Sequence, residues 1–411
     1  MPIALLLAQT GTVLVAGALL ARLLQSLKQP RVIAEIVAGI VLGPSVLGVV
    51  WPGAMQALFP PESLPLLGAV AELALVFFMF LVGLEFEADH LGDRAHAAVA
   101  VSAAGTAIPL VAGALVATQL PAGLAGANAT PLTFALFVGV AMSVTAFPVL
   151  ARILTERRLV HSRIGAIALA AAAVGDVAGW SLLAVVAGIA AASGLAGIAW
   201  TVGGGLLYTG IVWMGVRPWL HRRLARSSDA DATEDTAVVS ALVIASAWIT
   251  HALGLHALFG GFLMGAAMPG RATLTRDLPA RFGGFVTPVL LPLFFAFSGV
   301  RTRIGLLDSS GDWLLLLALL LLATVVKIAG AGLAARLTGS SPREALAIGV
   351  LMNTRGLMEV VVLNIGLDLG IISGQMFAIM VLVALLTTAA TPPLLAALGV
   401  DPGGHAEVTP T

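Results

Sequence analysis

Apolar segments, each about as long as a membrane-spanning helix, follow one another along almost the whole chain. Of the 411 residues, 59% are hydrophobic and only 10% are charged, and the mean hydropathy is +1.04. A soluble chain carries about a quarter charged residues, whereas about 20 consecutive apolar residues suffice to cross the hydrocarbon core of a bilayer. The sequence therefore predicts an all-α protein that crosses a membrane many times and has no soluble domain.

Polar, glycine-rich and proline-rich joints divide the chain into about thirteen apolar segments, which we expect to be transmembrane helices. They cover residues 3 to 25, 31 to 49, 65 to 86, 97 to 118, 131 to 153, 161 to 191, 195 to 216, 235 to 253, 256 to 270, 280 to 300, 313 to 335, 343 to 367 and 373 to 398. No basic residue precedes the first apolar run, so we expect that run to be a membrane helix and not a signal peptide.

The basic residues indicate the orientation of the chain, because Lys and Arg prefer cytoplasmic loops. With the amino terminus outside, the inner loops hold 17 of the 21 Lys and Arg residues. The outer loops hold only Arg301 and Arg303, and Lys327 and Arg355 lie inside predicted helices. This asymmetry favours thirteen spans, with the amino terminus outside and the carboxyl terminus in the cytoplasm.

Thirteen spans divide into six, one linker helix and six, so that matching helices of the two halves run in opposite directions. Such an inverted repeat is typical of secondary transporters. We expect the first repeat and the linker helix to cover residues 1 to 216, a cytoplasmic linker 217 to 234, the second repeat 235 to 398, and a short cytoplasmic tail 399 to 411.

The fifth segment, "FVGVAMSVTAFPVLARIL", is predicted to be a broken helix. Pro148 removes a backbone hydrogen bond and disfavours helical geometry at Phe147. Ser143 and Thr145 can supply oxygen atoms to the freed backbone. Broken helices at membrane depth are tolerated where they line a cavity enclosed by protein or filled with water.

The twelfth segment, which is the fifth of the second half, carries a matching interruption in "AIGVLMNTRGLMEVVVL". Asn353, Thr354 and Gly356 are weak helix formers at about the middle of this segment. We therefore predict a second discontinuous helix.

Five charged residues lie well inside predicted helices: Asp176, Lys327, Arg355, Glu359 and Glu72. Burying a charge at a helix centre is costly, so such residues either pair with one another and with helix ends or have a function. Arg355 and Glu359 are four residues apart on one helix face and suit either interpretation. For Glu72, a buried acid held by hydrogen bonds is favoured over a role in transport.

Asp176 is the acid for which a functional role is favoured. It is the only acid of the long segment that contains "AAAVGDVAGW", and the neighbouring Gly175 opens space beside it. His256, at the start of a segment, fits a helix-end role better than a proton relay.

The chain offers nothing that predicts an enzyme. No nucleophile with a base, pair of catalytic acids or metal cluster can be assembled from the segments, and there is no cysteine for thiol chemistry. A net charge of +0 shows no bias toward nucleic acid. We expect no cofactor, no nucleic-acid partner and no metal beyond a transported ion.

Seven motifs together resemble the monovalent cation:proton antiporter family, and especially its second branch, which includes plant cation/proton exchangers and bacterial sodium/proton antiporters. They stand in the expected order over nearly the whole chain. They read "PRVIAEIVAGIVLGPSVLG", "FFMFLVGLEFE", "SVTAFPVLARIL", "AAAVGDVAGW", "GLHALFGGFLMG", "LPLFFAFSGVRT" and "NTRGLMEVVVLNIGLDLGIIS".

The resemblance implies the sodium/proton antiporter fold, with two crossed discontinuous helices in a core domain, and with a dimerisation domain that makes a homodimer. Asp176 would bind either Na⁺ or K⁺ or a proton, and this competition, with alternating access, would be the exchange mechanism. Thr145 and Ser143 would offer oxygens to the cation, and Lys327 matches the lysine of the family's eleventh span. The protein would reside in the lipid bilayer of the inner (plasma) membrane of a bacterium.

Gly175 departs from the family pattern, in which an acid or Asn precedes the ion-binding acid. Lys327 then lacks its usual carboxylate partner on the sixth span. Two hypotheses follow. Asp176 alone carries the charge, giving electroneutral exchange, which we favour; or Lys327 releases a proton when Asp176 takes the cation, giving electrogenic exchange. The alternative class is a cation channel or a sodium-coupled solute symporter, although the few polar groups favour a bare ion.

Overall fold

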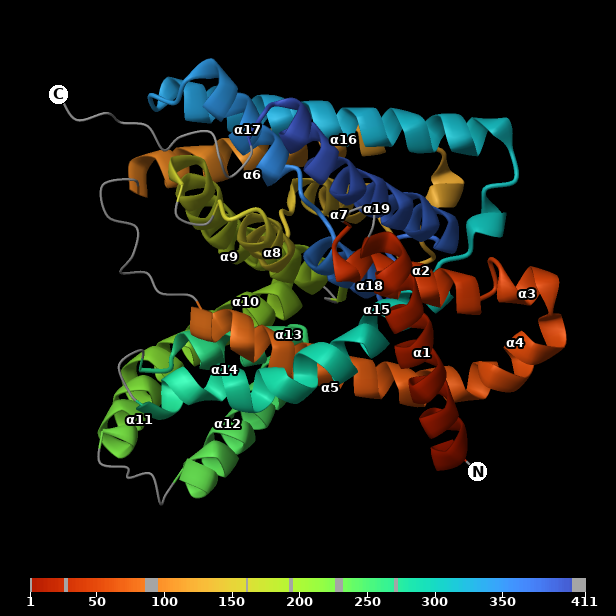
Figure 1. Cartoon of the computed structure of the whole chain (residues 1–411). Helices are drawn as coiled ribbons and strands as arrows, with labels where there is room; N and C mark the ends of the chain where they lie inside the picture. Colours follow the sequence, from red (N-terminus) through yellow and green to blue (C-terminus); the bar gives the residue numbers. More distant parts are fainter. Residues whose placement is uncertain are drawn as a thin grey trace. The chain divides into compact units, whose positions relative to one another are not determined.

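The computed structural model describes residues 2–25, 29–85, 95–159, 162–191, 195–225, 232–269 and 273–400. Over those residues the fold is helical, and the only β-type pairing is an isolated bridge between Ala125 and Ile372 (Figure 1). Part of the predicted cytoplasmic linker and nearly all of the predicted tail lie outside the described residues.

The helices are α1 (Pro2–Gln25), α2 (Arg31–Leu42), α3 (Leu47–Val50), α4 (Pro52–Leu58), α5 (Leu64–Glu85), α6 (Ala95–Ala117), α7 (Pro131–Ser143), α8 (Phe147–Glu156), α9 (Arg163–Ala191), α10 (Leu195–Ile211), α11 (Arg217–Leu224), α12 (Ala232–Ala252), α13 (Ala257–Ala266), α14 (Thr273–Phe285), α15 (Leu291–Arg301), α16 (Ser310–Leu337), α17 (Pro342–Met352), α18 (Leu357–Asp368) and α19 (Gly374–Ala397). One π-helical turn follows α10 and another joins α14 to α15.

Each predicted apolar segment coincides with one helix or with a run of consecutive helices. In the described part of the chain, nine helices are long and apolar enough to cross a membrane. The other four predicted segments hold shorter helices, and two of those segments, α7–α8 and α17–α18, are interrupted. The interruptions are the two predicted discontinuous helices.

The chain divides into two compact units that do not follow the predicted repeats, so the repeat boundaries stay a prediction. Unit 1 comprises Met1–Gly17, Ala38–His90 and Ala184–Arg301. Within it, α5 packs against α13 and α15, and α13 packs against α12. A Cβ at Gly265 of α13 would come within 2.1 Å of the Phe80 carbonyl oxygen, so only glycine allows the backbones of α13 and α5 to approach this closely.

Unit 2 comprises Ala18–Val37, Leu91–Leu183 and Thr302–Thr411. Within it, α6 packs against α7 and α16, and α16 packs against α17. Both interrupted pairs, α7–α8 and α17–α18, belong to this unit, together with the part of α9 that carries Asp176. Unit 2 therefore holds every element of the site described next.

Candidate functional site

The first interruption lies between α7 and α8, at residues 144–146. Val144 has extended backbone geometry, with φ −67° and ψ 141°, so the helix ends at Ser143. Phe147 and Pro148, where the sequence indicated the break, form the first turn of α8, so the observed break lies just before them. Proline is favoured in a first helical turn, where its missing N–H has no intrahelical partner to lose.

The second interruption lies between α17 and α18, at residues 353–356. Asn353 ends α17, and Gly356 begins α18 with φ +130°, a backbone conformation that side-chain-bearing residues rarely adopt. The predicted break at Asn353, Thr354 and Gly356 therefore coincides with the observed one.

The two interruptions are hydrogen-bonded to each other. The Thr145 hydroxyl donates to the Met352 carbonyl oxygen at 3.0 Å, and the Ala146 backbone N–H donates to the Thr354 carbonyl oxygen at 3.0 Å. Backbone groups freed by one broken helix are thus satisfied by the other, as burial away from water requires.

Two cations cap the carboxyl end of α7, where the last carbonyl groups of a helix lack intrahelical donors and carry partial negative charge. The Arg355 guanidinium donates to the carbonyl oxygens of Ala141 at 3.1 Å and Met142 at 2.8 Å. Lys327, on α16, donates to the carbonyl oxygen of Ser143. Arg355 and Lys327 are completely buried, so these contacts replace the solvation of both charges.

The same guanidinium forms a buried ion pair with Glu359 in the first turn of α18, at 3.1 Å between Nη1 and Oε2. An acid near a helix amino terminus is favourable for the helix dipole. Thr388 on α19 fixes the Arg355 backbone, because its hydroxyl accepts from the Arg355 N–H and donates to the Arg355 carbonyl oxygen. The positive charge of Arg355, at the break of the second helix, therefore faces both the carbonyl end of α7 and the carboxylate of Glu359.

Asp176 lies in the middle of α9 with only 4% of its surface exposed. Neither carboxylate oxygen accepts a hydrogen bond of normal geometry from the described residues. Lys327 and the backbone amide of Phe147 are the groups that interact with it electrostatically. A buried carboxylate without full hydrogen bonding is costly, so this position is suited to a residue that takes up a positive ligand.

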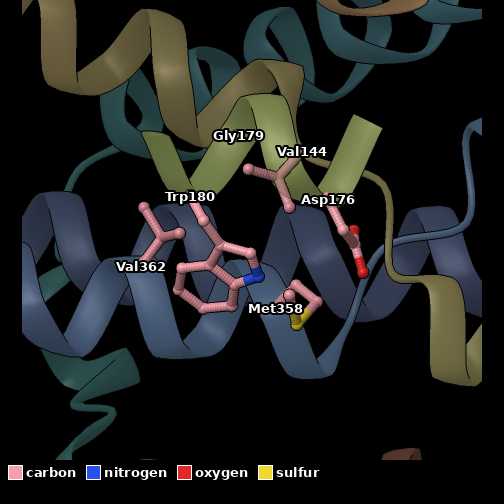
Figure 2. A pocket seen from close by; sticks show the side chains of 6 residues that line it. All are labelled: Val144, Asp176, Gly179, Trp180, Met358 and Val362. Carbon is pink, nitrogen blue, oxygen red and sulfur yellow. The ribbon is translucent and has the colours of Figure 1, made fainter. Parts of the chain in front are cut away.

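The space beside Asp176 is narrow and mostly apolar. Figure 2 shows it lined by Val144 at the first break, by Gly179 and Trp180 on α9, and by Met358 and Val362 on α18. It is too small to admit a water molecule. The carboxylate is therefore closed off from water in this conformation.

The other predicted site residues lie as follows. Ser143 is buried and donates to the Val140 carbonyl oxygen at 2.9 Å, and Thr145 is buried and donates as described above. Lys327, Arg355 and Glu359 lie around the crossing, which is the place where the two helix breaks are hydrogen-bonded to each other. Glu72 belongs to unit 1, where its side chain is exposed on α5 and not buried as expected, because the neighbouring Ala71, Ala74 and Leu75 supply the buried face of that helix.

Sequence reasoning missed Trp180 and Met358 as neighbours of Asp176. For Trp180 a signal existed, since it follows Asp176 by four residues on the same helix and must share its face. For Met358 no signal existed in one sequence, because its place depends on how α18 packs against α9.

Comparisons with known proteins identify the family to which the chain is similar. The profile of the family described as "Sodium/hydrogen exchanger, transmembrane" matches residues 12–398. The chain is 40% identical over 399 residues to Cation/H(+) antiporter 17 of Arabidopsis thaliana, which covers 96% of this chain and 48% of the plant protein. It is 36% identical over 394 residues to the Na(+)/H(+) antiporter NhaS4 of Synechocystis, covering 95% of this chain and 96% of that protein. The chain thus spans about half the length of the plant relative.

Among solved structures, the fold is similar to that of the sodium proton antiporter MjNhaP1 from Methanocaldococcus jannaschii, with a TM-score of 0.63. The likeness covers 97% of this chain and 98% of that one, at 15% sequence identity. At this identity, it is the predicted fold that the comparison confirms.

Proposed function

Because the chain belongs to the sodium/hydrogen exchanger family, we propose that it exchanges a monovalent cation, Na⁺ or K⁺, for protons across a membrane. The cation and the proton compete for the carboxylate of Asp176, and the site opens alternately to the two sides. Exchange follows from competition, because the carboxylate holds one positive ligand at a time.

The observation that carries the proposal is the isolation of Asp176. Neither oxygen accepts a hydrogen bond of normal geometry from the described residues, although the carbonyl oxygens of Met352 and Thr354 at the second break are paired with the first. A buried carboxylate in that state is stabilised by binding a proton or a dehydrated cation.

Proton movement in sealed proteoliposomes with an imposed pH gradient tests the proposal. We expect Na⁺ or K⁺ to dissipate the gradient with the unsubstituted protein and not with Asp176→Asn. Asp308→Asn is a matched control, because it removes an exposed acid of the same unit, and we expect it to leave exchange unchanged. Exchange that survives in Asp176→Asn would contradict the role of this carboxylate.

We propose that the exchange is electroneutral, with one proton for one cation. Among the described residues, Lys327 has no carboxylate within 4.0 Å, and it donates to the Ser143 carbonyl oxygen instead. In place of a second acid, the Gly175 position faces hydroxyls of α6: a Cβ there would lie 3.3 Å from Ser102 Oγ and 3.8 Å from Thr106 Oγ1. These contacts support a structural role for Lys327 and leave Asp176 as the group that titrates.

The remaining features of the proposal come from the sequence and the family. The protein resides in an inner (plasma) membrane, with its amino terminus outside and its carboxyl terminus in the cytoplasm. Each chain consists of two inverted repeats, and two chains form a homodimer. The distribution of Lys and Arg between alternate loops supports the orientation.

A further inference from the structure

The second helix break holds buried oxygen atoms that nothing in the described structure satisfies. Asn353 Oδ1 and Thr354 Oγ1 have no hydrogen-bond partner, and these residues are only 1% and 0% exposed. Both oxygens of Asp176 share this condition. Buried polar atoms are nearly always paired in native proteins, so a group of unpaired acceptors requires an explanation.

The backbone that carries Asn353 and Thr354 is held against the first break. The carbonyl oxygens of Met352 and Thr354, on either side of Asn353, both accept hydrogen bonds from the Thr145–Ala146 segment. Asp176 lies next to the residues on either side of Thr145 and Ala146, because it lines the same space as Val144 and interacts with the Phe147 amide. In Figure 2 the Asp176 side chain lies in the space that Val144, of the first break, and Met358, in the first turn of α18, also line.

We propose that Asn353 and Thr354 are ligands of the transported cation and complete, together with Asp176, a site built from α9 and the second broken helix. This inference rests on the proposed exchange function and specifies its binding site. The side-chain amide oxygen, the hydroxyl and the carboxylate are all oxygen ligands of the kind that hard cations prefer.

The charges around the crossing define which cation the site accepts. Lys327 and Arg355 are the buried cations and Glu359 is the second buried acid, with one of its oxygens already bound to Arg355. Asp176 therefore contributes one negative charge, and the two added ligands are neutral. One carboxylate with neutral oxygens suits a monovalent alkali ion, whereas Ca²⁺ sites use six to eight oxygen ligands and Mg²⁺ usually keeps several waters.

The decisive measurement is the apparent KM for Na⁺, K⁺ and Li⁺ in proteoliposome exchange, together with binding of the same ions to the purified protein by calorimetry. For Thr354→Val, which keeps the shape and removes the oxygen, we expect the apparent KM to rise at least fivefold with the maximal rate little changed. Asn353→Leu should also raise the apparent KM. Thr354→Ser keeps a hydroxyl, so its apparent KM should stay close to that of the wild-type protein, while the selectivity among the three ions should shift.

Thr391→Val is the matched control, because it removes a buried hydroxyl of α19 that donates to the Thr387 carbonyl oxygen. We expect it to lower the melting temperature and leave the apparent KM unchanged. If Thr354→Val does not fold, unchanged selectivity in Thr354→Ser and Asn353→Ser would overturn the inference.

The two proposals fail in different ways. Exchange that depends on Asp176 but keeps its KM and selectivity in every Asn353 and Thr354 variant would overturn the inference and leave the exchange function standing. Cation binding that depends on Thr354, in a protein that moves no protons, would overturn the exchange function and leave the site standing.

Discussion

The guanidinium of Arg355, at the break of one discontinuous helix, donates a hydrogen bond of 2.8 Å to the carbonyl oxygen of Met142, in the last turn of the other. The same group bonds the Ala141 carbonyl oxygen and the Glu359 carboxylate. One side chain thus satisfies two backbone acceptors and one buried charge, and it determines how the broken helices meet.

We therefore expect Arg355→Gln to destabilise the protein by about 3–5 kcal/mol, because it leaves Glu359 buried without its cation. The melting temperature of the purified protein in detergent measures the loss. Arg343→Gln is the control: this arginine is exposed and donates to the Leu398 carbonyl oxygen, so its removal should cost less than about 1 kcal/mol. Equal melting temperatures for the two variants would refute the argument.

A double variant sharpens this prediction. Arg355→Gln combined with Glu359→Gln removes both charges, so it should cost less than the sum of the two single changes. Strict additivity would mean that the ion pair seen at 3.1 Å contributes nothing to the crossing.

The stoichiometry has a signature in the pH dependence. One proton competing with one cation at Asp176 makes the apparent cation KM rise tenfold for each pH unit below the point where the carboxylate titrates, and affinity is regained as the pH rises. Cation uptake into proteoliposomes, measured over a series of pH values, gives this slope. A slope near two would instead require a second titrating group.

Cation uptake under an imposed membrane potential is an independent test of the same stoichiometry. An inside-positive potential imposed without ion gradients should not drive cation uptake by the wild-type protein, and Lys327→Gln, which keeps a donor for the Ser143 carbonyl oxygen, should behave identically. Uptake driven by potential in the wild-type protein and lost in Lys327→Gln would establish Lys327 as the second proton carrier.

The close approach of α13 to α5 gives a prediction in unit 1. Gly265→Ala should cost about 1–3 kcal/mol, because its Cβ would overlap the Phe80 carbonyl oxygen and force the helices apart. Gly284→Ala on α14 meets nothing within 4 Å and should be neutral or slightly stabilising. Melting temperatures of the two variants decide between a specific packing requirement and a general intolerance of added methyl groups.

Much of the helical framework could be predicted from sequence because hydrophobicity and proline or glycine positions are local signals. They located the apolar segments and both interruptions. His256 was expected at a helix end, and it caps the amino terminus of α13, accepting from the Leu258 N–H at 3.5 Å. Asp176 stood out because an acid in so apolar a segment is costly.

What the sequence left open depends on contacts between distant segments. Nothing local indicates that Lys327 reaches a carbonyl group 184 residues away, or that Arg355 reaches one 213 residues away. The exposed side of α5 could not be predicted either, because a helix with apolar residues on every face gives no periodicity from which to place Glu72.

The hydrogen bond from Thr145 to Met352 joins residues 207 positions apart. During synthesis the first broken helix is therefore made long before its partner exists, and until then its freed backbone groups have no permanent acceptors or donors in the apolar interior. The crossing is consequently a late event in biogenesis, completed when α17 and α18 enter the bundle. A chain truncated before α17 would keep its apolar helices but carry an open break, whose backbone groups would lack the partners that α17 and α18 supply.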